Sequence, residues 1–245
     1  MLNIKKIATH SLNFDILKIV ALITMVIDHI GYTLLPHNMD LRIIGRTTFP
    51  IFAFLLSYHL AKQSIFKKYI PRLFFFAVLS TLVIAPFDLK FNGYFKLNIF
   101  WSFLIAVLSL FIFDKISKEK TDKRLKLFIT ALCFSFFGAL SYLCDYKLTG
   151  FVLVLSLYFY FKTNNKIFFA TALIDSALIN SDDLFFAPQI VVPFIVVTVL
   201  TTFYLLYQSK YIQKKQVRFL KPWWIFYLFY PVHFLILYLI KTYYF

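Results

Sequence analysis

Residues 187–207 read APQIVVPFIVVTVLTTFYLLY, a stretch of twenty-one residues without a charged side chain. A helix needs about 20 mainly apolar residues to cross the hydrocarbon core of a bilayer. The stretch therefore predicts a membrane-spanning helix, and similar apolar runs recur along the chain. Together these runs predict an all-α fold, a polytopic bundle of transmembrane helices.

The composition of the whole chain supports the same fold class. Of the 245 residues, 61% are hydrophobic, and the mean hydropathy is +0.77. Soluble globular domains contain about 45–50% apolar residues, so the excess of apolar surface must face lipid. No segment is left over for a soluble domain, and we expect a single integral membrane domain over residues 1–245.

About nine spans are expected, and several of them are short or interrupted. The region 125–161 has two readings, because Asp145-Tyr146-Lys147 is typical either of a tight turn or of a break in a helix. The predicted spans cover roughly residues 13–35, 41–61, 70–88, 97–113, 125–144, 148–161, 167–181, 187–207 and 222–240.

The distribution of Lys and Arg between the loops predicts the orientation, because cytoplasmic loops carry an excess of both residues. With the N-terminus in the cytoplasm and the C-terminus outside, the outer segments contain only Lys90, Lys96, Lys147 and Lys241. A missed or additional span would invert every later loop and destroy this separation. The basic residues of the predicted cytoplasmic segments are Lys5, Lys6, Lys62, Lys67, Lys68, Arg72, Lys115, Lys118, Lys120, Lys123, Arg124, Lys126, Lys162, Lys166, Lys210, Lys214, Lys215, Arg218 and Lys221.

The loop lysines and arginines also explain most of the net charge of +15. On a soluble protein such a charge would suggest a nucleic-acid partner. Here most of it belongs to loops that lie next to anionic lipid. We therefore expect membrane lipids and no nucleic acid as partners, and a multi-pass location in a bacterial cytoplasmic (inner) membrane.

Ionisable residues within the spans are costly, so they normally face a cavity or a charged partner. In the first span, Lys18 and His29 are eleven residues apart, about three helical turns, and share one face. Asp15 lies one turn from Lys18, so a local ion pair is an equally good explanation of that lysine. Asp28 precedes His29, although the two side chains diverge by about 100° on a helix. A neutral imidazole can accept a proton near neutral pH, which makes His29 a candidate general base.

Two arginines and a proline mark the second span. Arg42 and Arg46 are four residues apart and share a face. Arg42 can extend to the interface, whereas Arg46 is deeper and needs a partner, which we expect to be Asp28, Asp175 or an anionic ligand. Pro50 frees a backbone carbonyl and is expected to kink the helix.

Four polar residues on four spans, His29, Arg46, Asp175 and His233, fall at comparable depth and predict one buried polar site. An ion pair that only holds helices together is the alternative reading for Asp175. The sequence contains no phosphate-binding loop, no pair of cysteines with metal spacing and no HExxH motif. We therefore expect no metal ion.

Three segments resemble the TraX family, namely KIVALITMVIDH at 18–29, GRTTFPIFAF at 45–54 and YLFYPVH at 227–233. Weaker similarities occur at Lys96-Leu-Asn98 and between Asp145 and Gly150. The resemblance implies a relation to proteins that acetylate the N-terminus of conjugative pilin, and to integral membrane acyltransferases that modify cell-surface sugars. The chain departs from the family in the loop before the last span, where Tyr207-Gln208-Ser209-Lys210 replaces an Asn-Gly-Lys-Arg-Gly type of segment.

The resemblance also implies roles for single residues, because the acyltransferases carry a basic residue, ten intervening residues and a histidine in the first span. Lys18 and His29 match this spacing. By resemblance, His29 with Asp28 is catalytic, and acetyl-CoA is the acyl donor. The cofactor-binding residues are then Lys18, Arg46, Lys67, Lys68 and Arg72, with Arg46 or Asn98 next to the developing oxyanion. The expected binding residues for a pilin or surface glycan acceptor are Arg42, Asn98, Asp175, Tyr230 and His233.

Two other functions fit the same residues. In a transporter or flippase, the charges within the spans would form a path for protons or anions. In a non-catalytic assembly factor for pili or surface polymers, they would only hold helices together. The sequence also leaves open whether the acetyl group passes directly to the acceptor or through an acyl-enzyme on His29.

Overall fold

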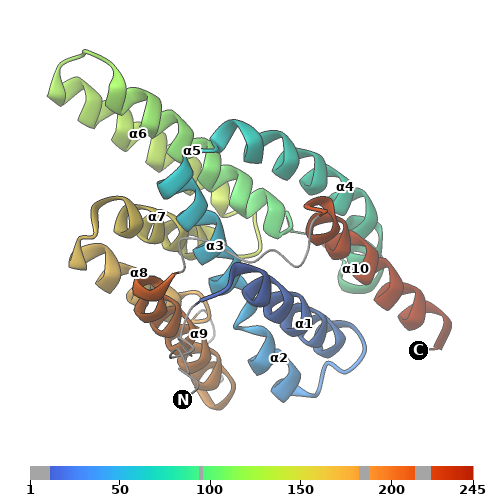
Figure 1. Ribbon diagram of the computed structural model, residues 1–245. Helices are drawn as coiled ribbons and strands as arrows, with labels where there is room; N and C mark the ends of the chain where they lie inside the picture. The colour runs from blue at the N-terminus through green and yellow to red at the C-terminus, as the bar shows by residue number, and fades with distance from the viewer. Residues whose placement is uncertain (1–11, 94–95, 182–187, 213–221, 245) are drawn as a thin grey trace, which may run out of the picture.

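Helices make up nearly all of the described chain, which comprises residues 12–93, 96–181, 188–212 and 222–244 of a computed structural model (Figure 1). Within these residues no strand forms, and the only bridge of strand type joins Leu97 to Cys144. The helices are α1 Phe14–Thr33, α2 Met39–Gly45, α3 Thr48–Gln63, α4 Phe66–Asn92, α5 Ile99–Lys118, α6 Lys123–Ser141, α7 Lys147–Thr163, α8 Lys166–Leu178, α9 Pro188–Gln208, the short 3-10 turn η1 Ser209–Tyr211, and α10 Trp224–Tyr244. The predicted all-α fold class is confirmed.

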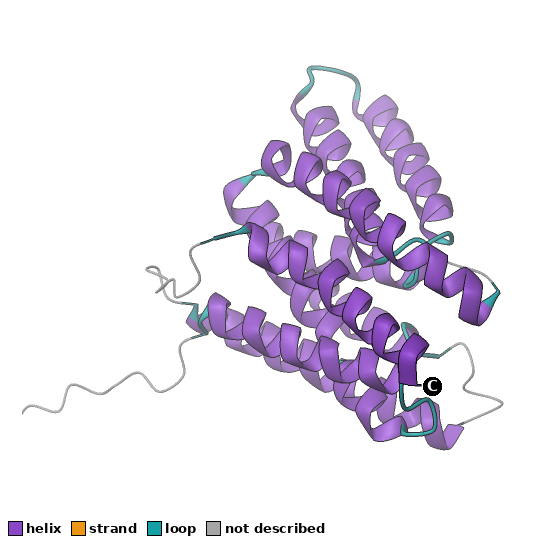
Figure 2. Ribbon diagram, turned by 90° about the vertical axis from the view of Figure 1, so that its right-hand side faces the viewer, coloured by secondary structure: helices purple, strands orange, loops and turns teal. Residues whose placement is uncertain are grey.

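Helix α3 lies at the centre of the bundle, where it contacts α1, α7 and α9. Its residues Phe49, Ala53, Phe54 and Leu60 are almost completely buried. Helix α10 packs on α1 and α4, whereas α6 lies at the edge, against α5 and α7. Short loops join most neighbouring helices (Figure 2). The first and the last helix are therefore neighbours, although they are far apart in the sequence.

Asparagine and aspartate side chains begin several of the helices. Asn13 accepts hydrogen bonds from the amides of Asp15 and Ile16 at the start of α1, and Asn98 accepts one from Phe100 at the start of α5. Such caps satisfy backbone donors that have no partner within the helix. They fix where each helix begins, and therefore the position of the following residues along the helix axis.

The second predicted span, 41–61, is broken into α2 and α3 at Arg46 and Thr47. Pro50 is the third residue of α3. It has no N–H to donate to the carbonyl of Arg46, and its ring would clash with that carbonyl in a continuous helix. The expected kink thus lies before the proline, where Arg46 and Thr47 form a turn between the two helices.

Six helical segments are long and apolar enough to cross a membrane, namely Met39–Gln63, Phe66–Phe91, Ile99–Lys118, Lys123–Ser141, Pro188–Tyr211 and Trp224–Tyr244. Large apolar side chains such as Phe75, Leu82 and Leu127 are 60–72% exposed on their outer faces, as expected of surfaces that contact lipid. Helices α7 and α8 have 17 and 13 residues, which gives about 25 and 20 Å against a core of about 30 Å. The nine-span count therefore remains a prediction.

Contacts between helix ends show that the basic loops that follow these helices gather at one end of the bundle. Lys62 donates to the carbonyl of Phe161 at 2.7 Å, and Lys162 approaches Asp114 at 3.5 Å. At the opposite end, the Tyr238 hydroxyl donates to Asp88 at 2.6 Å. This separation agrees with the predicted orientation for the described loops; Lys5, Lys6, Lys214, Lys215, Arg218 and Lys221 lie outside the described residues.

Asp145 and Tyr146 lie in a tight turn between α6 and α7, and Lys147 is the first residue of α7. The amide of Asp145 donates to the carbonyl of Leu97 at 3.0 Å, and the amide of Leu97 donates to that of Leu143 at 3.0 Å. These bonds hold the turn against the start of α5. The reading of 125–161 as two helices is confirmed, and the turn is anchored next to the polar centre of the protein.

Candidate active site

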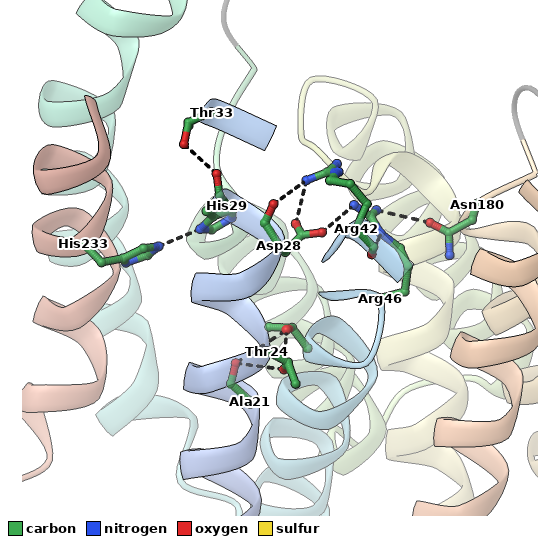
Figure 3. Close-up of polar contacts among 10 residues, drawn as sticks. Ala21, Thr24, Asp28, His29, Thr33, Arg42, Arg46, Asn180 and His233 are labelled. Atoms are coloured by element: carbon green, nitrogen blue, oxygen red, sulfur yellow. Dashed lines mark hydrogen bonds and ion pairs between the residues drawn. The ribbon is translucent and has the colours of Figure 1, made fainter. Parts of the chain in front are cut away.

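Two histidines from the first and the last helix, His29 on α1 and His233 on α10, meet inside the bundle (Figure 3). His29 Nδ1 on α1 lies 2.6 Å from His233 Nε2 on α10. The ring of Phe234 lies 4.1 Å from the His29 ring, and Tyr230 meets it edge-on at 5.9 Å. The predicted approach of these two histidines is therefore present in the structure.

Backbone carbonyls assign the tautomers of this pair. His233 Nδ1 lies 2.7 Å from the carbonyl oxygen of Phe229, which can only accept a hydrogen bond. His233 Nδ1 therefore carries the proton, and its Nε2 is an acceptor when the ring is neutral. His29 Nδ1 must then donate to His233, which leaves the lone pair of His29 on Nε2. A histidine in this tautomer can act as a general base through Nε2.

Asp28 lies between two arginines, Arg42 within α2 and Arg46 directly after the last residue of α2 (Figure 3). Its oxygens accept from Arg42 Nη1 at 2.9 Å and from Arg46 Nη2 at 3.0 Å. Gly45 makes this approach possible, because a Cβ atom there would collide with the Asp28 side chain. Of the partners expected for Arg46, the structure shows Asp28, and Asp28 is held by arginines rather than by His29.

Arg46 extends this network towards α8 and α9. Its Nη1 donates to the side-chain oxygen of Asn180 at 3.3 Å, and Asn180 Nδ2 donates to the Thr198 hydroxyl at 3.2 Å. The guanidinium also lies over the ring of Phe194, 5.0 Å from its centroid. Asn180 was not a sequence candidate, since an uncharged amide near the end of a span gives no distinctive signal. The resulting chain of contacts holds α1 and α2 against α8 and α9.

A small chamber of about 40 Å³ lies next to the histidine pair. Asp145 and Tyr146, in the turn between α6 and α7, line it, although the sequence showed them only as turn residues. Asp145 as a whole is exposed, yet the surrounding protein keeps much of its carboxyl group from water. This removal from water, reinforced by Asp88 and opposed by Lys96, raises the pKa of Asp145 to about 7. The complete lining is Met25, Asp28, His29, Gly45, Thr48, Ile99, Asp145, Tyr146 and Tyr230.

A larger cavity of about 310 Å³ lies on the side of the basic loops. Lys18, Lys68 and Arg72 line it together with aromatic residues such as Phe100 and Phe103. Lys18 also forms the ion pair with Asp15 that the sequence suggested, at 2.8 Å. Three predicted cofactor-binding residues therefore share one cavity, whereas Lys67 and Arg46 are not among its described lining residues.

The two cavities are separated by a shared wall. Met25, Ile99 and Tyr230 line both of them. Each of these residues is at most 6% exposed. A molecule in the larger cavity thus meets the same three side chains that border the chamber of His29.

Asn98 and Asp175 lie away from the chamber, and the position of Asp175 corrects the expectation of one site shared by four spans. Asn98 uses its amide group to bind the carbonyl of Ala77 at 3.2 Å and the Thr81 hydroxyl at 3.1 Å. Asp175 accepts from Ser156 at 2.8 Å between α8 and α7. Neither is among the described residues that line the chamber. Arg42, Arg46 and His233 are not among them either, but these three contact Asp28 or His29, which do line it. Depth in the membrane alone did not reveal which face of its helix each residue occupies.

Comparisons with known proteins place the chain in a family. The TraX protein family matches residues 13–241, which include both histidines and both arginines. An uncharacterized protein of Rickettsia prowazekii (strain Madrid E) is 46% identical over 54 residues, a stretch that covers 22% of this chain and 22% of that protein. No solved structure gives a significant match. Because the family match covers nearly the whole chain and several helices are able to cross a membrane, the protein is a membrane protein that belongs to the TraX family.

Proposed function

We propose that the protein is a membrane-embedded acyltransferase that moves an acetyl group from acetyl-CoA to an amine or hydroxyl group. The observation that carries the proposal is the position of His29. Its hydrogen bond to His233 leaves Nε2 as a proton acceptor, and its chamber shares a wall with a larger cavity bordered by basic side chains.

The donor enters the larger cavity from the cytoplasmic end. The phosphates of CoA bind at its basic residues, where hydrogen bonds between oppositely charged groups are stronger than neutral ones. Arg72 is additionally held over the ring of Trp223, 3.7 Å from its centroid. The apolar pantetheine arm lies along the aromatic side chains, and the thioester reaches the wall formed by Met25, Ile99 and Tyr230. Lys18 also contributes to binding the phosphates, although its ion pair with Asp15 partly neutralises its charge.

The transfer needs only one proton acceptor. The nitrogen or oxygen of the acceptor attacks the thioester carbonyl carbon, while His29 Nε2 takes the proton from that atom. The new bond to carbon forms, the carbon–sulfur bond breaks, and the imidazolium returns its proton to the departing thiolate of CoA. Tyr146 and Tyr230, which line the chamber, supply neutral hydroxyl donors for the oxyanion, the role that Asn98 was expected to share.

His233 acts as a positioning residue in this scheme. Its Nε2 accepts the proton on His29 Nδ1 and thereby holds the tautomer and the orientation of the base. Once His29 is protonated, the same hydrogen bond stabilises the imidazolium. This arrangement follows the general logic of a base oriented by a third group.

The acceptor approaches from the opposite end, where the turn at Asp145 and Tyr146 borders the chamber. An acceptor on the outer side of a bacterial inner membrane, a pilin or a surface glycan, would meet the acetyl group there. The donor remains on the cytoplasmic side, so acetyl-CoA itself does not need to cross the membrane.

The proposal is tested by label transfer from radioactive acetyl-CoA in membranes that contain the protein and a candidate acceptor. Replacing His29 by Ala removes the base, and we expect the rate to fall about 10²- to 10⁴-fold. His37→Ala is the matched control, because His37 is exposed in the loop between α1 and α2. Label transfer that is unaffected by His29→Ala would eliminate this role, and substrate uptake into vesicles without acetyl-CoA would favour a transporter instead.

A further inference from the structure

The wall between the two cavities consists of side chains of different stiffness. Met25 is 4% exposed, and Ile99 is 6% exposed. Methionine is unbranched and can change its shape easily, whereas the β-branched isoleucine is restricted. One component of the wall can thus give way to an arriving group, and the other is rigid.

Ile99 is fixed by the backbone on which it stands. It is the first residue of α5, directly after the cap Asn98. The amide group of Asn98 is bound to α4, and Leu97 is hydrogen-bonded to the turn at Asp145. These contacts hold the start of α5 on two sides, so Ile99 marks a fixed boundary of the chamber.

The chamber behind this wall has little space. A volume of about 40 Å³ accommodates about three water-sized groups, at 10–15 Å³ each. An acetyl group, with its carbonyl carbon, oxygen and methyl, is of that size. A butyryl group adds two methylenes, which would have to displace Met25 or Ile99. On the opposite side Gly45 is already packed against Asp28 and cannot give way.

We infer that Met25 and Ile99 set the length of the acyl group that reaches His29, and that they restrict the donor to acetyl-CoA and similarly short thioesters. The inference rests on the proposed acyl transfer and adds the residues that determine its specificity. The larger cavity admits the common CoA portion of every donor, so discrimination takes place at the wall.

The test compares acetyl-CoA, propionyl-CoA and butyryl-CoA as donors for the full-length protein in lipid. Met25→Ala enlarges the chamber, and we expect the ratio of kcat/KM for butyryl-CoA to that for acetyl-CoA to rise tenfold or more, since one methylene in an apolar pocket changes selectivity by about 10- to 200-fold. Ile99→Val, which removes a single methyl, should shift the ratio in the same direction by less. It serves as the second variant if Met25→Ala does not fold.

Two control variants distinguish a change in the wall from a general effect of substitution on the donor ratio. Met25→Leu conserves volume and is expected to leave the ratio unchanged. Met39→Ala makes the same substitution on α2 at a residue that is 37% exposed and is not among the described lining residues of either cavity.

The outcomes distinguish this inference from the proposed function. If the wild type transfers acetyl but the donor ratio stays the same in the folded Met25→Ala and Ile99→Val variants, the length filter is overturned and acyl transfer stands. If the wild type transfers none of the three acyl groups, both the proposed acyl transfer and the length filter are overturned.

Discussion

At the scale of single residues, the side chains of His29 and His233 are chemically identical but have different roles. His29 keeps Nε2 available, whereas both nitrogens of His233 are engaged, one with Phe229 and one with His29. The base and its orienting partner are thus distinguished only by the backbone carbonyl next to one of them.

Replacing His233 should therefore affect the rate more than donor binding. We expect His233→Ala to lower kcat by less than the 10²- to 10⁴-fold of losing the base itself, with the KM for acetyl-CoA unchanged. His233→Gln restores a side-chain acceptor and should recover part of the rate. The measurement is initial-rate kinetics of label transfer. Equal losses in kcat for both His233 variants, or a rise in KM alone, would contradict a positioning role.

At the scale of helices, the junction between α2 and α3 has the largest effect on the site. Pro50 forces the break, and the break lets Gly45 and the two arginines approach Asp28 from the side. The apolar pattern over 41–61 indicated one span with a kink at Pro50. The structure places the break before the proline, at Arg46 and Thr47, so Arg46 lies in the break itself and contacts Asp28 from there.

Gly45→Ala is expected to disturb this junction strongly. The added methyl group collides with the side chain of Asp28, so α2 must move away or the ion pairs must break. Overpacking a close contact typically costs about 1–3 kcal/mol, and loss of a buried ion-pair partner adds to this. Thermal unfolding in detergent should show a clear decrease in Tm. Gly138→Ala is the control, because its methyl group would meet the flexible end of Leu148 at 3.2 Å and the ring of Phe151 at 3.8 Å, which is an ordinary contact; a similar decrease there would contradict a special role for Gly45.

The sequence patterns predicted where the helices lie in the chain better than which face of each helix points to the site. His29 and His233 were found because a charged or titratable side chain in an apolar span is conspicuous. Asp175 was equally conspicuous, but it faces Ser156 on a neighbouring helix. Met25, Ile99 and Tyr146 line the chamber, yet apolar and aromatic residues in a membrane protein rich in both carry no individual signal. Their role depends on tertiary packing alone.

At the scale of the whole molecule, charge is distributed unequally between the two ends. The basic loops gather at one end, and the larger cavity opens among Lys18, Lys68 and Arg72. The count of lysines and arginines predicted this polarity from sequence, because loop charge reflects insertion into the membrane. It did not predict which of them would line a cavity, since that depends on how α4 is turned.

Two adjacent lysines on α4 allow a direct test of the basic cavity. Lys68 lines the cavity, whereas Lys67 is not among its described lining residues. Lys68→Gln should raise the KM for acetyl-CoA about fivefold, which corresponds to about 1 kcal/mol for an exposed charge pair, while kcat remains unchanged. Lys67→Gln should have little effect. The difference should shrink as salt is added, because exposed charges are screened; equal changes in KM for both variants would argue against a specific phosphate site.

The wall of Met25, Ile99 and Tyr230 has a bioenergetic consequence. Cavities that approach each other from opposite ends leave a barrier only one layer of side chains thick, and a bilayer with an aqueous passage cannot hold its proton gradient. Met25 and Ile99 carry no group that passes protons, so the hydroxyl of Tyr230 is the one proton-exchanging group among these three buried side chains, and we expect the wall to slow proton leakage during the long intervals between turnovers. The same residues that border the reaction chamber would thereby help the membrane to keep its potential.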